Sequence, residues 1–192
     1  MSTVGAVFLD KDGTLIEDVP YNVAPERIRL MPGACEGLRL LAGAGWPLIV
    51  VTNQSGVAHG YFREAALAGV EARLRTLVAQ CGAPLAGFYY CPHHPAGSVL
   101  PYARHCRCRK PRPGLLLRAA RELPVDLGRS WLVGDILHDV EAGSRAGCRT
   151  VLLVNGHETE WVLGPRRLPD YLAADLNDAA RFIVRNSPPG GQ

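Results

Sequence analysis

The sequence predicts an α/β fold, a three-layer sandwich built around a mostly parallel β-sheet. Short apolar runs of strand length alternate with longer segments of helical periodicity along the 192 residues. This alternation is typical of parallel sheets covered by helices on both faces. Polar residues follow several of the apolar runs, at the edge where such sheets bind ligands. The two observations together predict an α/β protein with a polar site at one edge of its sheet.

Five apolar runs are expected to form the strands of this sheet. Each is short and uninterrupted by charge, as strands buried on both faces are. They are Ala6–Leu9, Leu48–Val51, Phe88–Tyr90, Trp131–Val133 and Thr150–Val154.

Helices are expected between these strands, with glycine or proline marking several of their ends. The segment Ala34–Ala44 ends at Gly45, and the segment Arg63–Gln80 is followed by Gly82 and Pro84. Further helices are expected over Pro113–Leu123, Leu137–Ala146 and Asn177–Val184.

The length of the chain favours one compact domain, which we expect to span residues 1–185. Residues 186–192 are rich in proline and glycine and are expected to form a disordered tail. We see neither a signal-peptide pattern nor an apolar run of about 20 residues, so we expect a cytoplasmic protein without a membrane partner. The net charge of +3 is too small to indicate nucleic acid by itself. We expect a monomer.

Three of the six cysteines, Cys35, Cys81 and Cys148, stand singly in apolar surroundings. Cytoplasmic cysteines rarely form disulfides, and a free cysteine packs as a small apolar residue. We therefore expect these three to be unpaired packing residues.

The most informative feature is the pair Asp10 and Asp12, directly after the first apolar run. Two carboxylates at the end of a buried strand are unfavourable unless a partner compensates them. A divalent cation is such a partner, and it would leave one carboxylate free for chemistry. Taken alone, Asp12 could instead be a turn residue before Gly13.

Three other features fall near the same edge of the predicted sheet. Thr52 and the residues to Gly56 offer a hydroxyl and backbone N–H groups to phosphate oxygens. Lys110 offers positive charge, and Asp135 offers another carboxylate to a metal. Alone, Thr52 could be a strand end and Asp135 a helix N-cap. We expect Asp139 to support the site from outside or to lie on a helix surface rather than to bind metal.

The segment Cys91–Arg112 is too long and too polar to be an ordinary connection. Three thiols and one imidazole in it match a closed, structural zinc site. The ligands that this spacing indicates are Cys91, His93, Cys106 and Cys108. His94 or His105 could replace His93, and the cysteines could also be unmetallated thiols. We expect a zinc-binding loop over residues 91–108.

Five basic residues crowd into nine positions of this segment, with no acidic residue among them. They are Arg104, Arg107, Arg109, Lys110 and Arg112. The cluster indicates an anionic partner. For Arg104, Arg107 and Arg112 a solvated surface is the competing interpretation.

The ordered motifs Asp10-x-Asp12-Gly13-Thr14, Thr52-Asn53, Lys110 and Gly134-Asp135 with Asp139 resemble the signature of the haloacid dehalogenase (HAD) superfamily of phosphohydrolases. The resemblance implies a Rossmann-like, HAD-like fold and an aspartyl-phosphate mechanism. It makes Asp10 the nucleophile and Asp12 the general acid and base, with Thr52 and Lys110 stabilising the phosphoryl group. Mg²⁺ would be bound by Asp10, Asp135 and the Asp12 backbone carbonyl.

Over about Val7–Val154 the chain also resembles the D-glycero-D-manno-heptose 1,7-bisphosphate 7-phosphatase family. The segments that carry this resemblance are Phe8–Thr14, Val51–Gly56, Tyr89–Pro95 and Cys106–Pro111. The resemblance implies a sugar bisphosphate substrate, a place in ADP-heptose synthesis, no nucleic-acid partner, and His93 as the fourth ligand of a structural Zn²⁺. The substrate contacts that it implies are Asp18, Tyr21, Asn53, Gln54, Ser55 and Arg109.

One position departs from the family pattern, because Ile136 stands where relatives have lysine. This leaves the preferred sugar anomer open. The chain also lacks a large cap domain, so loops near Asp18–Tyr21 and Ser55–Tyr61 are expected to shape the pocket with the zinc loop.

Three other functions compete with this interpretation. Histidinol-phosphate phosphatase is a close alternative, but the pairing of Arg109 with Lys110 favours a substrate with two phosphates. A zinc-stabilised nucleic-acid-binding module would explain the basic loop but not the three aspartates. A phospho-accepting signalling domain would need a persistent aspartyl-phosphate, which Asp12 is placed to hydrolyse.

Overall fold

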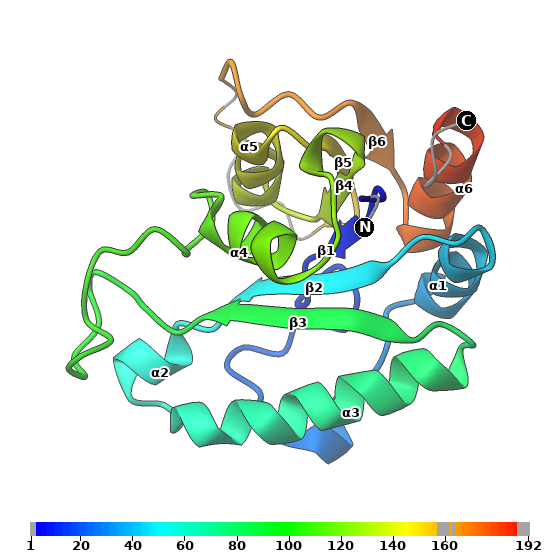
Figure 1. The fold of residues 1–192 in the computed structure, drawn as a ribbon. Coiled ribbons are helices and arrows are strands. Elements are labelled where there is room, and N and C mark those ends of the chain that lie inside the picture. The colour runs from blue at the N-terminus through cyan, green and yellow to red at the C-terminus, as the bar shows by residue number, and fades with distance from the viewer. Residues whose placement is uncertain (1–2, 157–161, 163, 188–192) are drawn as a thin grey trace.

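The structure of the chain is a computed structural model that describes residues 3–156, 162 and 164–187. Within these residues, six strands form one sheet in the order β3-β2-β1-β4-β5-β6, and every neighbouring pair is parallel (Figure 1). The strands are β1 (Val7–Leu9), β2 (Leu48–Asn53), β3 (Leu85–Cys91), β4 (Trp131–Gly134), β5 (Arg149–Leu153) and β6 (Tyr171–Ala173). The predicted α/β class is confirmed.

The helices alternate with the first five strands along the chain, and the last helix follows β6. They are α1 (Ala34–Gly43), α2 (Gly56–His59), α3 (Leu67–Gln80), α4 (Gly114–Glu122), α5 (Leu137–Ala146) and α6 (Leu176–Asn186). Short 3₁₀ turns cover Pro25–Arg27, Glu64–Ala66 and Leu127–Arg129. In the described part of the chain, we find no helix with the length and apolar character that crossing a bilayer requires.

The core consists of two apolar layers, one on each face of the sheet. Successive strand residues point to opposite faces, so Leu48 and Val50 of β2 pack with α1, α3 and α6, whereas Ile49 and Val51 pack with α4. Figure 1 shows α1, α3 and α6 on one side of the sheet and α4 and α5 on the other. The predicted three-layer sandwich is confirmed.

The structure extends and refines several predicted elements. β2 and β3 continue to Asn53 and Cys91, because parallel pairing carries them past the apolar runs into the polar residues of the edge. The helix predicted from Arg63 begins with a 3₁₀ turn. β6 was not predicted, because three residues beside β5 give no periodic signal. α6 continues to Asn186, and residues 188–192 of the predicted tail lie outside the described residues.

Two cysteines expected to be unpaired are joined, and that prediction was wrong. Cys35 at the start of α1 and Cys81 after α3 form a disulfide with a Cα–Cα distance of 5.3 Å. Both helices pack on the same face of the sheet, which brings together residues 46 positions apart. Cys148 is a free, buried cysteine as expected.

Candidate active site

The carboxyl ends of β1, β2 and β4 meet around a cavity of about 260 Å³, here named the edge cavity. Its lining consists of Asp10, Asp12, Asp18, Thr52, Asn53, Ser55, Arg109, Lys110, Asp135, Ile136 and His138. Tyr21 and Gln54 line a neighbouring cavity of about 260 Å³, which shares Asp12, Asp18 and Ser55 with the first. Every residue predicted from the sequence to act in catalysis, substrate binding or magnesium binding therefore lines one of these two cavities.

A tight turn after β1 presents Asp10 and Asp12 at this edge. Gly13 has φ of +75°, which glycine adopts without strain, and its N–H donates to the Ile16 carbonyl at 2.9 Å. The next hydroxyl, that of Thr14, donates to Asp135 Oδ1 at 3.2 Å and so connects the turn to the end of β4. The turn interpretation of Gly13 and the functional interpretation of the two aspartates are therefore compatible.

Three buried carboxylates lie together, two of them, Asp10 and Asp135, in the lining of the edge cavity and the third, Asp139, behind that lining. One oxygen from each of Asp10, Asp135 and Asp139 lies within 4.8 Å of the others. Lys110 Nζ lies 2.6 Å from both Asp10 Oδ1 and Asp139 Oδ1, and it donates to the Val51 carbonyl at 3.0 Å. Three carboxylates thus share one ammonium group, which leaves an excess of negative charge.

The protonation of these groups reflects that excess. Burial and the neighbouring Asp10 and Asp139 raise the pKa of Asp135 well above its ordinary value. Burial and Asp10 likewise raise the pKa of Asp139. Burial lowers the pKa of Lys110, but its two ion pairs outweigh that effect and the net pKa is raised. The acids resist ionisation, whereas the lysine stays charged.

This charge balance fits a divalent cation with oxygen ligands. Mg²⁺ prefers carboxylate and carbonyl oxygens, and two positive charges would offset the repulsion that raises the pKa of Asp135 and Asp139. The residues present therefore fit Mg²⁺, and two of them, Asp10 and Asp135, are among the ligands expected from the sequence.

Asp139 is more central than the sequence indicated. Its side chain is 1 % exposed and pairs with Lys110, so the expectation that it could lie on a helix surface was wrong. Gly134 makes room for it, because a Cβ at residue 134 would lie 2.3 Å from Asp139. The glycine that precedes Asp135 thus has a packing reason to be there.

Asp12 lies on the solvent side of this cluster. Its Oδ1 is 2.6 Å from Lys11 Nζ, and its Oδ2 accepts a hydrogen bond from Gln54 Nε2 at 3.3 Å. Burial raises the pKa of Asp12, and the Lys11 charge partly offsets that rise. Gln54 also donates to Thr52 Oγ1 at 3.0 Å, so one amide connects Asp12 to Thr52.

Two residues of this network were given no role from the sequence, although one of them, Thr14, ends the Asp10–Thr14 motif. Lys11 is 2 % exposed and sits between the two aspartates, and a lysine flanked by acids after a strand is the signal that could have identified it. Thr14 is fully buried against Asp135, but a threonine after a glycine turn has many other uses.

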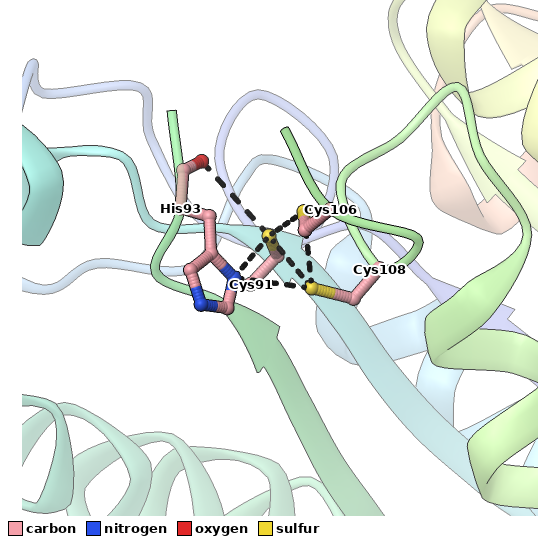
Figure 2. Close-up of side chains that lie close together, drawn as sticks. All are labelled: Cys91, His93, Cys106 and Cys108. Carbon is pink, nitrogen blue, oxygen red and sulfur yellow. Dashed lines mark hydrogen bonds between the residues drawn. The ribbon is translucent and has the colours of Figure 1, made fainter. Parts of the chain in front are cut away.

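The four residues predicted to bind zinc converge, as Figure 2 shows. The three sulfur–sulfur distances are 3.0 Å for Cys91–Cys108, 3.4 Å for Cys106–Cys108 and 3.5 Å for Cys91–Cys106. His93 Nδ1 lies 3.4 Å from Cys108 Sγ and 3.7 Å from Cys91 Sγ. One ion with bonds of about 2.0–2.3 Å can reach all four atoms, so the set fits a closed tetrahedral zinc site.

His93, rather than His94, faces this cluster. The His94 ring instead lies 4.7 Å from that of His59 at the end of α2. Beyond it, the N–H groups of Ser98 and Val99 donate to the Ala58 carbonyl at 2.8 and 3.0 Å. The part of the loop at His93 therefore contributes to the candidate metal site. The part around Ser98 and Val99 packs on α2.

Comparisons with known proteins agree with this geometry. The HAD-hydrolase-like family model matches residues 107–179. The D-glycero-beta-D-manno-heptose-1,7-bisphosphate 7-phosphatase of Yersinia pestis is 40 % identical over 79 % of this chain and 81 % of its own length. The enzyme of the same name from Escherichia coli K12 is 41 % identical over 79 % of this chain and 80 % of its own length.

Among solved structures, the D,D-heptose 1,7-bisphosphate phosphatase of B. bronchiseptica, complexed with magnesium and phosphate, is similar with a TM-score of 0.78. It is 30 % identical, and the match covers 95 % of this chain and 99 % of that one. Fold, site geometry and sequence similarity agree, and the chain belongs to the D-glycero-beta-D-manno-heptose-1,7-bisphosphate 7-phosphatase family of HAD-like hydrolases.

Proposed function

We propose that this chain is a Mg²⁺-dependent phosphatase that removes the C7 phosphate of D-glycero-D-manno-heptose 1,7-bisphosphate. The observation that carries the proposal is the contact of 2.6 Å between Lys110 Nζ and Asp10 Oδ1, in a cavity also lined by Asp12 and Thr52. A nucleophile, a proton donor and phosphate-binding groups are thereby within one small volume. Relatives that carry the β-anomer in their names support that anomer as the substrate.

Asp10 is proposed as the nucleophile. A bond forms between one of its carboxylate oxygens and phosphorus, while the bond from phosphorus to the C7 oxygen of the sugar breaks. The product of this step is an aspartyl-phosphate. Lys110 holds the Asp10 carboxylate in place before the reaction.

Asp12 is proposed as the general acid and then the general base. A raised pKa suits a group that must carry a proton before the reaction. Asp12 gives this proton to the departing C7 oxygen. It then takes a proton from a water molecule that attacks the aspartyl-phosphate, which releases phosphate and restores Asp10.

Thr52 and Lys110 are proposed to bind the oxygens of the transferred phosphoryl group. Gln54 orients the Thr52 hydroxyl, because its amide occupies one lone pair of that oxygen. Lys110 Nζ donates to the Val51 carbonyl and forms ion pairs with Asp10 and Asp139. The ion pair with Asp10 places the ammonium group beside the proposed nucleophile.

Mg²⁺ would be held by the carboxylates of Asp10 and Asp135 and the backbone carbonyl of Asp12, and when bound it supplies positive charge that offsets repulsion between phosphate and carboxylate. Thr14 fixes the orientation of the Asp135 carboxylate. Zn²⁺ would be held by Cys91, His93, Cys106 and Cys108, and when bound it supplies structural order to the loop. Arg109 directly follows this set and is proposed to contact the substrate.

The remaining substrate contacts are also proposals. Asp18 and Ser55 line both the edge cavity and its neighbour, and Tyr21 and Gln54 line the neighbouring cavity alone. These positions support contacts to the sugar. Asn53 is proposed as a substrate contact too, although both groups of its amide already bind the backbone of Lys110. We further propose a monomer that acts in the cytoplasm, with neither nucleic acid nor membrane as a partner.

Phosphate release from a panel of substrates tests the function. The panel contains both anomers of heptose 1,7-bisphosphate, fructose 1,6-bisphosphate, histidinol phosphate and p-nitrophenyl phosphate, each with Mg²⁺. We expect the β-anomer of the heptose bisphosphate to give the highest kcat/KM. A preference for histidinol phosphate would contradict the substrate but not the chemistry.

The variant Asp10→Asn is the control for the chemistry. It keeps the size of the side chain but removes the nucleophile, so we expect a folded protein without turnover. Asp170→Asn removes a carboxylate that binds Thr150 far from the site and should retain activity. Turnover by Asp10→Asn would overturn the assignment of the nucleophile.

A further inference from the structure

The cavity beside the edge cavity, here named the neighbouring cavity, is lined by two separate segments of the chain. Residues 18 and 20–22 line it from the loop after β1, and residues 53–56 line it from the end of β2 and the start of α2. Lys11 and Asp12 complete the lining. The width of this cavity therefore depends on how the loop after β1 is held relative to α2.

Few hydrogen bonds hold the segment 18–21 of this loop in place. Residues 18, 20 and 21 are exposed, and within the described chain the one hydrogen bond that we find to the segment joins the Asn22 N–H to the Val19 carbonyl at 3.1 Å. Tyr21 is also the one non-glycine residue of the described chain with a positive φ, at +55°. A bulky residue keeps this conformation only where surrounding contacts stabilise it. Those contacts must come from the Tyr21 side chain.

The Tyr21 ring packs against two aromatic rings from the other side of the neighbouring cavity. Its centroid lies 4.5 Å from that of Tyr61, in an edge-to-face arrangement, and 6.5 Å from that of His59. Tyr61 stacks on His59 at 5.5 Å, and the His59 ring lies 4.7 Å from that of His94 in the zinc loop. Aromatic pairs of this kind stabilise a structure beyond the area that they bury. These four rings are here named the aromatic cluster.

The backbone fixes the element that carries Tyr61 and His59. Gly60 ends α2 with φ of +77°, and the Tyr61 N–H donates to the Gly56 carbonyl at 2.9 Å. The zinc loop also donates two backbone hydrogen bonds to α2. The two rings are thus presented by a well-held turn, whereas Tyr21 comes from a loop with few contacts of its own.

Tyr61 and His59 line neither the edge cavity nor the neighbouring cavity. They act on the site through Tyr21, which lines the neighbouring cavity. Tyr21 is 51 % exposed and Tyr61 is 62 % exposed, so packing in the core does not hold these two rings. Their contact with each other therefore determines where Tyr21 lies.

We propose that Tyr61 and His59 are positioning residues for the substrate. Their rings hold Tyr21, and with it Asp18, relative to α2, and so set the width of the neighbouring cavity for the sugar chain that lies beyond the reacting phosphate. His94 connects the aromatic cluster to the zinc loop. The effect on the substrate rests on the proposed function, whereas the anchoring of the segment 18–21 does not.

Amide hydrogen exchange of residues 17–24, followed by mass spectrometry without substrate, tests the anchoring. Tyr61→Ala should speed this exchange roughly 2- to 10-fold, the effect of losing one aromatic pair. Tyr61→Phe keeps the ring and should exchange as wild type does. Tyr171→Ala removes a ring that stacks on Phe182 at 3.9 Å, outside the cluster, and should leave this exchange unchanged. Unchanged exchange in Tyr61→Ala would overturn the proposal.

A double variant tests whether Tyr61 acts through Tyr21. Tyr21→Ala alone should speed the exchange of residues 17–24, and adding Tyr61→Ala should speed it no further, because the ring contact is already lost. A further acceleration would contradict the proposal, since it would indicate a general loss of stability. The zinc content of Tyr61→Ala should equal that of wild type. A loss of zinc would also contradict the proposal, because unfolding of the zinc loop would then explain the exchange.

Steady-state kinetics connect the anchoring to the substrate. Acetyl phosphate carries its phosphate on a group too small to extend from the edge cavity into the neighbouring cavity. Tyr61→Ala should raise KM for heptose 1,7-bisphosphate roughly 2- to 10-fold relative to KM for acetyl phosphate, and Tyr61→Phe should restore the wild-type ratio. An equal change for both substrates would contradict a positioning role. If wild type does not turn over heptose bisphosphate, the proposed function fails, and the exchange experiment still decides the anchoring.

Discussion

Asn53 and Lys110 exchange two hydrogen bonds, the Lys110 N–H donating to Asn53 Oδ1 at 3.0 Å and Asn53 Nδ2 donating to the Lys110 carbonyl at 3.2 Å. The last residue of β2 thereby fixes the backbone of a residue 57 positions later. Because the Lys110 side chain pairs with Asp10 and Asp139, this contact also fixes the ammonium group in the edge cavity.

Replacing Asn53 by alanine should therefore reduce turnover by displacing Lys110. We expect kcat to fall roughly 10- to 100-fold, since small displacements of a catalytic group have effects of this size. The free energy of unfolding should fall by about 1–3 kcal/mol, the range for two lost hydrogen bonds. Steady-state kinetics and urea unfolding measure the two effects. Asn186→Ala, which removes a hydrogen bond within α6, should leave kcat unchanged.

Replacing Lys11 by methionine should shift the pH profile. Burial raises the pKa of Asp12, while the charge and hydrogen bond of Lys11 lower it. Without Lys11 the pKa of Asp12 rises further, and the carboxyl group keeps its proton to higher pH. If Asp12 is the proton donor, the basic limb of kcat/KM for the heptose bisphosphate moves to higher pH. Lys11→Arg keeps the charge and should keep the limb in place; an unmoved limb in Lys11→Met would argue against Asp12 as the acid.

Replacing Cys108 by serine should reduce both metal content and activity. Cys108 lies near Cys91, Cys106 and His93, and Lys110 follows two residues later. Loss of one thiolate weakens zinc binding and releases the segment that positions Lys110. Elemental analysis should give less than one zinc per chain, together with a lower kcat. Cys148→Ala, at a buried cysteine outside the cluster, is the matched control; unchanged zinc in Cys108→Ser would exclude that ligand.

Reducing the bond between Cys35 and Cys81 should destabilise the fold. The bridge closes a loop of 46 residues, and cross-links of this length contribute roughly 2–4 kcal/mol to the free energy of unfolding. Urea unfolding with and without a reducing agent measures the difference. Cys35→Ala should unfold as reduced wild type does, whereas Cys148→Ala should still respond to the reducing agent. Six reactive thiols, rather than four, in the denatured and unreduced chain would contradict the bridge.

Much of the fold was predictable because strands of a buried parallel sheet consist of continuous apolar residues, which can be recognised in the sequence. α5 has the bounds that its glycine signal indicates, and the five predicted runs all lie within or overlap strands. β6 escaped prediction because its three residues gain their order from pairing with β5. Its existence is a tertiary effect that local sequence does not encode.

The site shows the same division between local and tertiary information. Asp10, Asp12 and Asp135 could be identified because each lies within three residues of the end of a strand, where side chains of a parallel sheet converge. Asp139 lies one helical turn further on, and its burial depends on the space beside Gly134. The disulfide depends on the packing of α1 and α3 on a common face, which no spacing in the sequence reveals.

The loop over residues 91–108 closes a ring of short connections beside the edge cavity. Cys91 pairs with Asn53 across β2 and β3, Asn53 binds Lys110, and Lys110 follows Cys108, which returns to Cys91. An insertion or deletion within Cys106–Lys110 would move the zinc ligands and Lys110 together, so the length of this segment is fixed. Residues 94–105 lie outside the ring, and variation in chain length within this family should therefore concentrate there.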